Sequence, residues 1–156
     1  MNEPIQRGLA VESAFGKVLM LRDPDARPAT RSEQFAHIDW VSKFGTFDVK
    51  ARKRATRASA SFNDDWVWLE IDNVRGDRGW LRSNVKYLAF ERVDDFVIFR
   101  REDVRQMAQS LCSYNVVTEA KHAPYNLYSR AGRKDLLTVI RMGDMLGLEH
   151  RVWVKV

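Results

Sequence analysis

The sequence predicts an α+β or mixed α/β fold, with a central mixed sheet of about five strands flanked by helices. Two observations predict it: apolar residues recur at helical spacing in residues 5–21 and 102–112, and segments of β-branched and aromatic residues lie between them. A chain of 156 residues favours one domain. We expect its core at about residues 5–112 and a C-terminal extension at about 113–156.

The N-terminal third predicts a helix, a loop and a hairpin, in that order. Residues 5–21 follow a proline and place apolar side chains near helical spacing, at Ile5, Leu9, Phe15, Val18 and Leu19. Residues 22–33 contain two prolines and few apolar residues, which is typical of an exposed loop. Residues 35–42 and 46–51 are expected to be strands, separated by Lys43-Phe44-Gly45, where glycine supplies the positive φ of a turn.

The remaining elements are predicted by the same patterns. Three further strands are expected at 66–71, 85–91 and 95–100, and the last two are expected to pair as a second hairpin. Residues 102–112 predict a helix that packs one face on a sheet. The C-terminal third predicts a loop, a strand, a capped turn and a final strand, at 113–126, 136–142, Asp144 and 152–156.

Composition excludes several classes of protein. With 45% hydrophobic and 11% aromatic residues, the chain is expected to fold rather than stay disordered. No stretch approaches the roughly 18–20 apolar residues of a membrane span, and the polar start lacks the pattern of a signal peptide, so we expect a cytoplasmic protein without a membrane partner. The single cysteine, Cys112, forms neither an internal disulfide nor a zinc cluster and is interpreted as a small buried residue.

The positive charge is concentrated in one segment. The net charge is +5, and residues 50–57 contain five cations and no anion: Lys50, Arg52, Lys53, Arg54 and Arg57. Such a cluster attracts polyanions, because neutralising phosphates releases their condensed counterions. A solvated loop is the alternative explanation.

The first hairpin carries the candidate catalytic and metal-binding residues. Side chains two apart in a strand share a face, so Asp48 and Lys50 point the same way. A two-residue turn at Phe44-Gly45 would place Asp39 opposite Lys50 and diagonal to Asp48, whereas a three-residue loop would need a bulge to do so. Two close carboxylates repel each other unless a proton, a cation or a metal offsets them. Mg²⁺ takes one or two carboxylates and completes its shell with water and phosphate oxygens.

These residues resemble the PD-(D/E)XK phosphodiesterase superfamily, which includes restriction enzymes, Holliday junction resolvases and phage endonucleases. The resemblance rests on Asp39, on Asp48-Val49-Lys50 after a glycine turn and on Glu12 in the preceding helix. It implies a restriction-endonuclease-like core and a Mg²⁺- or Mn²⁺-dependent nuclease that cleaves DNA. Asp39 and Asp48 would then hold the metal, with the Val49 carbonyl and Glu12 as further ligands, and Lys50 would orient the attacking water.

The chain departs from the family pattern in two places, and other functions stay open. Ile38 stands where the family name implies proline, and Asp48 is the less common of the two permitted acids. A non-catalytic DNA- or RNA-binding protein that uses residues 52–57 is the main alternative, and a structural interaction protein is the third. Two-strand cleavage would favour a homodimer, and a phage origin would place the protein in the host cytoplasm.

Other residues have both a functional and a structural interpretation. His37, Gln34 and Glu70 are candidates for contacts with the substrate or the metal cluster, and each is also explained as an ordinary structural residue. Trp66 and Trp68 share a strand face, and a role in the core is preferred to stacking on bases. A second basic group binds a phosphate backbone or only aids solubility: Arg130, Arg133 and Lys134.

Overall fold

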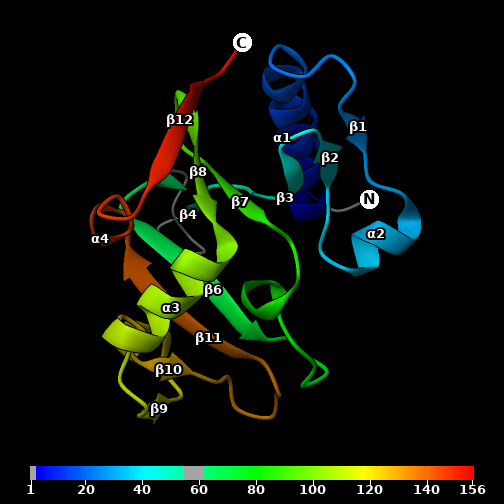
Figure 1. Ribbon diagram of the computed structural model, residues 1–156. Helices are drawn as coiled ribbons and strands as arrows, with labels where there is room; N and C mark the ends of the chain where they lie inside the picture. Colours follow the sequence, from blue (N-terminus) through cyan, green and yellow to red (C-terminus); the bar gives the residue numbers. More distant parts are fainter. Residues whose placement is uncertain (1–2, 55–61) are drawn as a thin grey trace. The chain divides into compact units, whose positions relative to one another are not determined.

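The computed structural model describes residues 3–54 and 62–156 (Figure 1). The chain forms two compact units that interleave in sequence. The first unit comprises Met1–Asp64, Asn84–Arg100 and Glu149–Val156, and the second comprises Asp65–Ser83 and Arg101–Leu148. Within the described ranges, no helix has the length and apolar character needed to cross a membrane. The expected α+β class is confirmed.

The first unit contains two helices and a six-stranded mixed sheet. The helices are α1 (Glu3–Met20) and α2 (Arg31–Phe35). The strands, in spatial order, are β1 (Arg27–Pro28), β2 (Trp40–Ser42), β3 (Gly45–Lys50), β7 (Tyr87–Glu91), β8 (Asp95–Arg100) and β12 (His150–Val154). β3 and β7 are parallel, whereas the other neighbours are antiparallel. A separate two-stranded sheet pairs β4 (Lys53–Arg54) with β5 (Phe62–Asn63).

Helix α1 packs on the sheet by the apolar face that its sequence predicts. Its buried residues recur every three or four positions: Val11, Phe15, Val18 and Leu19. They form one core with buried residues of the strands: Phe47, Val49, Ala89, Phe96 and Ile98. Figure 1 shows α1 beside β2 and β3. This packing brings the middle of α1 next to the first hairpin.

The first hairpin closes with a two-residue turn, which is one of the two arrangements that the sequence analysis considered. Ser42 pairs with Gly45, so the turn residues are Lys43 and Phe44, one position earlier than expected. Gly45 has a φ of 134°, and a Cβ there would lie 2.6 Å from Cδ of Lys86. Glycine is therefore required at this position by the backbone conformation, whereas the flexible Lys86 side chain can move away from a Cβ.

Two expectations on the chain before this hairpin were wrong. Residues 22–33 are not all loop, because β1 and the start of α2 fall within them, and Thr30 and Glu33 form a capping box on α2. The expected strand at 35–42 is reduced to β2, because α2 ends at Phe35 and His37 follows with a φ of 64°. The left-handed backbone at His37 cannot continue a strand, so the chain turns before Trp40.

The second unit holds a second sheet that the sequence did not predict. Its strands, in spatial order, are β6 (Trp66–Asp72), β11 (Leu136–Arg141), β10 (Leu127–Tyr128) and β9 (Val116–Val117). Helix α3 (Arg101–Leu111) buries Val104 and Ala108, and the short elements are η1 (Trp80–Arg82), η2 (Ala120–His122) and α4 (Met142–Met145). The expected C-terminal extension began at about residue 113. Up to Leu148, its residues belong to the same unit as β6, because β11 pairs with β6.

The buried face of β6 is not the tryptophan face. Val67 and Leu69 are buried, whereas Trp66 and Trp68 point to the other face and are half-buried. Their rings contact Tyr125 and Tyr128 of the same unit, respectively. The preference for a tryptophan core was therefore wrong: Val67, Leu69 and Ile71 make the other face apolar throughout, whereas Glu70 and Asp72 share the face of the tryptophans.

Candidate metal-binding and catalytic site

The structure brings together four side chains that the sequence singled out. Lys50 Nζ lies 2.9 Å from Asp48 Oδ1. Asp39 raises the pKa of the carboxyl groups of both Asp48 and Glu12, so it is an electrostatic neighbour of both. The four residues are thus neighbours, with Asp39 coupled to both Glu12 and Asp48, and Lys50 paired with Asp48.

Backbone pairing in the hairpin holds Asp39 against β3. The Asp39 N–H donates to the Phe47 carbonyl at 2.7 Å, and the Val49 N–H donates to Asp39 Oδ2 at 2.7 Å. Trp40 pairs with Phe47, and continuing this register brings Asp39 level with Asp48. The sequence analysis had expected Asp39 opposite Lys50. The difference arises because the turn begins one residue earlier. The shared face is unchanged, since the register moves by two residues.

Trp40 positions Glu12 beside this hairpin. The Trp40 indole N–H donates to the Glu12 backbone carbonyl at 3.0 Å. The ring crosses α1 at Gly16, where an added Cβ would lie 2.0 Å from the indole. Glycine at position 16 therefore permits the close approach that brings the Glu12 side chain within reach of Asp39.

Burial controls the ionisation of two of the three acids. Asp48 is 3% exposed, and this burial raises the pKa of its carboxyl group to about 7. The Lys50 ammonium opposes that rise, and Asp39 adds to it. The pKa of Glu12 is likewise raised to about 7, first by burial and then by the neighbouring Asp39. Near neutral pH, protons therefore compete with any cation for this cluster.

One buried oxygen of the cluster has no donor. Asp48 Oδ2 is buried and has no hydrogen-bond partner among the residues that the structure describes. Two neighbouring ionised carboxylates repel each other, so the pair of Asp39 and Asp48 is offset by a proton, by the Lys50 ammonium or by a further cation. A hard divalent cation fits this donor set, because it prefers carboxylate oxygens.

The protein supplies only a few candidate ligands for a metal ion. Within residues 3–54 and 62–156, no group of three or more Asp, Glu, His or Cys side chains is placed so that all of them could hold one metal ion. Asp39 and Asp48 are therefore the direct candidates, and Glu12 reaches them through Asp39. Mg²⁺ bound by two carboxylates would keep positions for water and substrate oxygens. A ligand role for the Val49 carbonyl stays a prediction.

The basic segment is anchored at its beginning. Arg52 Nε lies 2.5 Å from Asp64 Oδ1, and the Arg52 N–H donates to Glu91 at 3.0 Å. Lys53 is exposed in β4. Arg57 and the side chain of Arg54 lie outside the described residues. Arg52 is thus engaged by an acid of its own unit, and Lys53 is an exposed residue.

Glu91 is a site residue that the sequence analysis missed. Besides the Arg52 N–H, it engages Arg7 Nη2 at 3.2 Å and Lys155 Nζ at 3.0 Å. These contacts fix the chain two residues after Lys50. The sequence offers no signal for this role, since a glutamate at the end of an apolar strand is ordinary and its partners lie more than 35 residues away in the chain.

The remaining candidate residues lie in other surroundings. Glu70 is in β6, which pairs with β11 rather than with the hairpin. Gln34 belongs to α2, and His37 adopts a turn conformation instead of sharing a strand face with Asp39. In the second basic group, Arg130 forms an ion pair with Asp135.

Comparison with known proteins adds no identification. No protein-family model, curated protein or solved structure matches this chain. The interpretation of the site therefore rests on its residues and their geometry.

Proposed function

We propose that this protein is a divalent-metal-dependent endonuclease that hydrolyses DNA phosphodiester bonds on a restriction-endonuclease-like core. The observation that carries the proposal is the grouping of Asp39, Asp48 and Lys50 on the first hairpin: the Val49 N–H holds the Asp39 carboxylate against β3 at 2.7 Å, Lys50 Nζ lies 2.9 Å from Asp48, and one buried Asp48 oxygen has no donor among the described residues. A pair of carboxylates with an adjacent ammonium suits phosphodiester hydrolysis, because the acids hold a cation and the ammonium meets a phosphate or water oxygen.

The charge of the cluster favours a bound cation. Glu12, Asp39 and Asp48 supply three carboxyl groups against the single ammonium of Lys50. When ionised, this set repels a phosphodiester, so binding of a scissile phosphate needs additional positive charge at the site. Mg²⁺ or Mn²⁺ supplies that charge through ligands of the type present here.

Each residue then has a distinct task. Asp39 and Asp48 would hold the cation, which would stabilise the charge that builds on the phosphoryl oxygens and promote deprotonation of the attacking water. Asp39 is itself oriented by the Val49 N–H at 2.7 Å. The Lys50 side chain is 25% exposed, so its ammonium is accessible to water and to a substrate oxygen. Glu12, which lies in α1, would help to hold the Asp39 side chain in position.

A cleavage assay tests the proposal. Supercoiled, linear, branched and single-stranded DNA are incubated with the full-length protein in Mg²⁺, Mn²⁺ or EDTA. We expect cutting only with a divalent metal. Asp48→Asn and Lys50→Ala should each lower the rate by at least about 100-fold, in the range found when one group that stabilises a transition state is removed.

A matched control separates the site from general charge effects. Asp72→Asn removes a carboxylate that pairs with Arg82 at 2.6 Å in the second unit, and it should leave the cleavage rate within about twofold. Metal-dependent cutting by Asp48→Asn at the wild-type rate would exclude the proposed mechanism.

Non-catalytic nucleic-acid binding is the second candidate, and the exposed Lys53 of β4 favours it. In that case affinity for DNA or RNA would persist in EDTA and fall steeply with salt, while no metal would produce cutting. The same incubation therefore distinguishes the two functions.

A further inference from the structure

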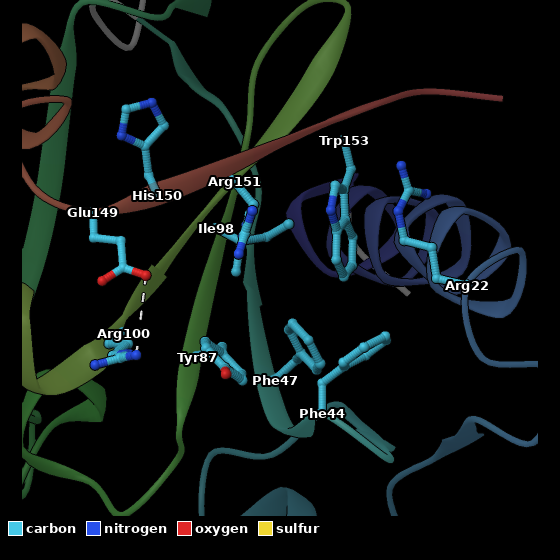
Figure 2. A pocket seen from close by; sticks show the side chains of 10 residues that line it. All are labelled: Arg22, Phe44, Phe47, Tyr87, Ile98, Arg100, Glu149, His150, Arg151 and Trp153. Carbon is cyan, nitrogen blue, oxygen red and sulfur yellow. Dashed lines mark ion pairs between the residues drawn. The ribbon is translucent and has the colours of Figure 1, made fainter.

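A second candidate site lies in the first unit and shares strand β3 with the carboxylate cluster, but it uses the opposite face of that strand. It is a pocket of about 400 Å³, within the range of small-molecule sites. Figure 2 shows aromatic and charged side chains around it, with Arg22 beside Trp153 and with Arg100 beside Glu149. The aromatic residues are Phe44, Phe47, Tyr87 and Trp153.

The aromatic part is rigid because its rings are supported from behind. Phe47 is buried and stacks on Tyr87, with ring centroids 5.1 Å apart and planes inclined by 26°. Trp153 stacks on the fully buried Phe15 at 6.0 Å with planes inclined by 11°. A preformed set of flat apolar surfaces favours a planar ring as ligand, since ordering costs little on binding.

The charged part of the lining is mainly positive. The Arg22 guanidinium lies 4.5 Å from the centroid of the Trp153 ring. Arg100 and Glu149 form an exposed ion pair at 4.0 Å, which contributes little and is readily exchanged for another partner. Arg151 is exposed and pairs with no carboxylate in the part of the chain that the structure describes. The excess of guanidinium groups therefore favours an anion.

The pocket and the carboxylate cluster are separated by β3. Phe47 and Asp48 are consecutive in this strand, so their side chains point to opposite faces. None of Glu12, Asp39, Asp48 and Lys50 lines the pocket. A ligand here would therefore bind without contact with the proposed catalytic groups.

We propose that this pocket binds a nucleobase together with its adjoining phosphate. The base would lie against the half-buried Phe44 and Trp153, with the buried Phe47 supporting them from behind, and the phosphate would meet Arg151 and Arg100. Stacking on aromatic side chains and bidentate contact with guanidinium groups are the two interactions that this chemistry requires. The unit occurs both in free mononucleotides and in unpaired stretches of DNA or RNA, and the assay below distinguishes these sources. The proposal does not depend on nuclease activity.

Binding is measured by calorimetry on the full-length protein in EDTA, which prevents metal-dependent cleavage. The probes are adenosine 5′-monophosphate, adenosine, ribose 5-phosphate, inorganic phosphate, a single-stranded oligonucleotide and a blunt duplex of the same length. We expect the mononucleotide or the single strand to bind at least about tenfold more tightly than adenosine, the two phosphates or the duplex. Tighter binding of the mononucleotide indicates a free nucleotide as ligand, and tighter binding of the strand indicates unpaired bases.

Two variants and a control test the placement. Arg151→Ala and Phe44→Ala alter opposite parts of the lining, and each should weaken binding by about tenfold or more. Lys17→Ala removes an exposed cation of α1 that does not line the pocket, and it should leave affinity within about twofold. The proposal is overturned if inorganic phosphate or the duplex binds as tightly as the preferred probe. Unchanged affinity in both folded variants, or no binding of any probe, overturns it equally.

Discussion

Replacing Asp48 by asparagine should stabilise the metal-free protein at neutral and alkaline pH. The pKa of this carboxyl group rises from the ordinary 3.8 to about 7 on folding, mainly because the group is buried. Between these two values the folded state holds a proton that the unfolded state has released. Stability of the wild type therefore falls as pH rises from about 4 to about 7 and stays reduced above that.

The size of the effect follows from the same two pKa values. An increase from 3.8 to about 7, at about 1.36 kcal/mol per pH unit, corresponds to about 4 kcal/mol at pH 8. Asparagine resembles the protonated acid in shape and does not ionise, so Asp48→Asn avoids this cost. For a chain of 156 residues, the melting temperature of the variant should rise by roughly 8–16 °C at pH 8.

Thermal unfolding in EDTA at several pH values tests this reasoning. The difference between Asp48→Asn and the wild type should be near zero below pH 4 and should grow up to about pH 7. Asp72→Asn alters a paired carboxylate of the second unit and should show no such growth. If Asp48→Asn is less stable than the wild type at pH 8, the buried carboxylate is not destabilising and the account of its pKa is refuted.

Two further predictions concern packing and the basic segment. Gly16→Ala should destabilise the protein by about 1–3 kcal/mol in chemical denaturation, because its Cβ would lie 2.0 Å from the Trp40 ring; unchanged stability would show that Trp40 moves away freely. Lys53→Ala should reduce the slope of log K against log salt for DNA binding by about 0.9, as expected for one lost phosphate contact. An unchanged slope would mean that Lys53 does not touch the backbone of DNA.

The first hairpin follows from local rules, which is why the sequence predicts it and permits the cluster. Glycine at position 45 indicates the turn, and strand alternation places Asp48 and Lys50 on one face. Asp39 joins them because the two-residue turn keeps the faces in agreement. The deep burial of Asp48 could not be predicted, since it depends on packing by residues distant in the sequence.

The second sheet illustrates the opposite case. β6 pairs with β11, so Trp68 lies beside Val139 although they are about 70 residues apart. Apolar alternation predicts that both segments are strands, but it does not specify their partner. Helix α2 was missed for a different reason: its capping box, Thr30 and Glu33, is visible in the sequence, but the prolines nearby favoured a loop.

Binding of Mn²⁺ to the carboxylate cluster tests the central claim most directly. Titration of the full-length protein at pH 8, followed by electron paramagnetic resonance of free Mn²⁺, counts bound ions and measures their affinity. The account predicts a site whose affinity falls by at least about 100-fold in both Asp39→Asn and Asp48→Asn and is unchanged in Asp72→Asn. Equal Mn²⁺ affinity in all four proteins would contradict it.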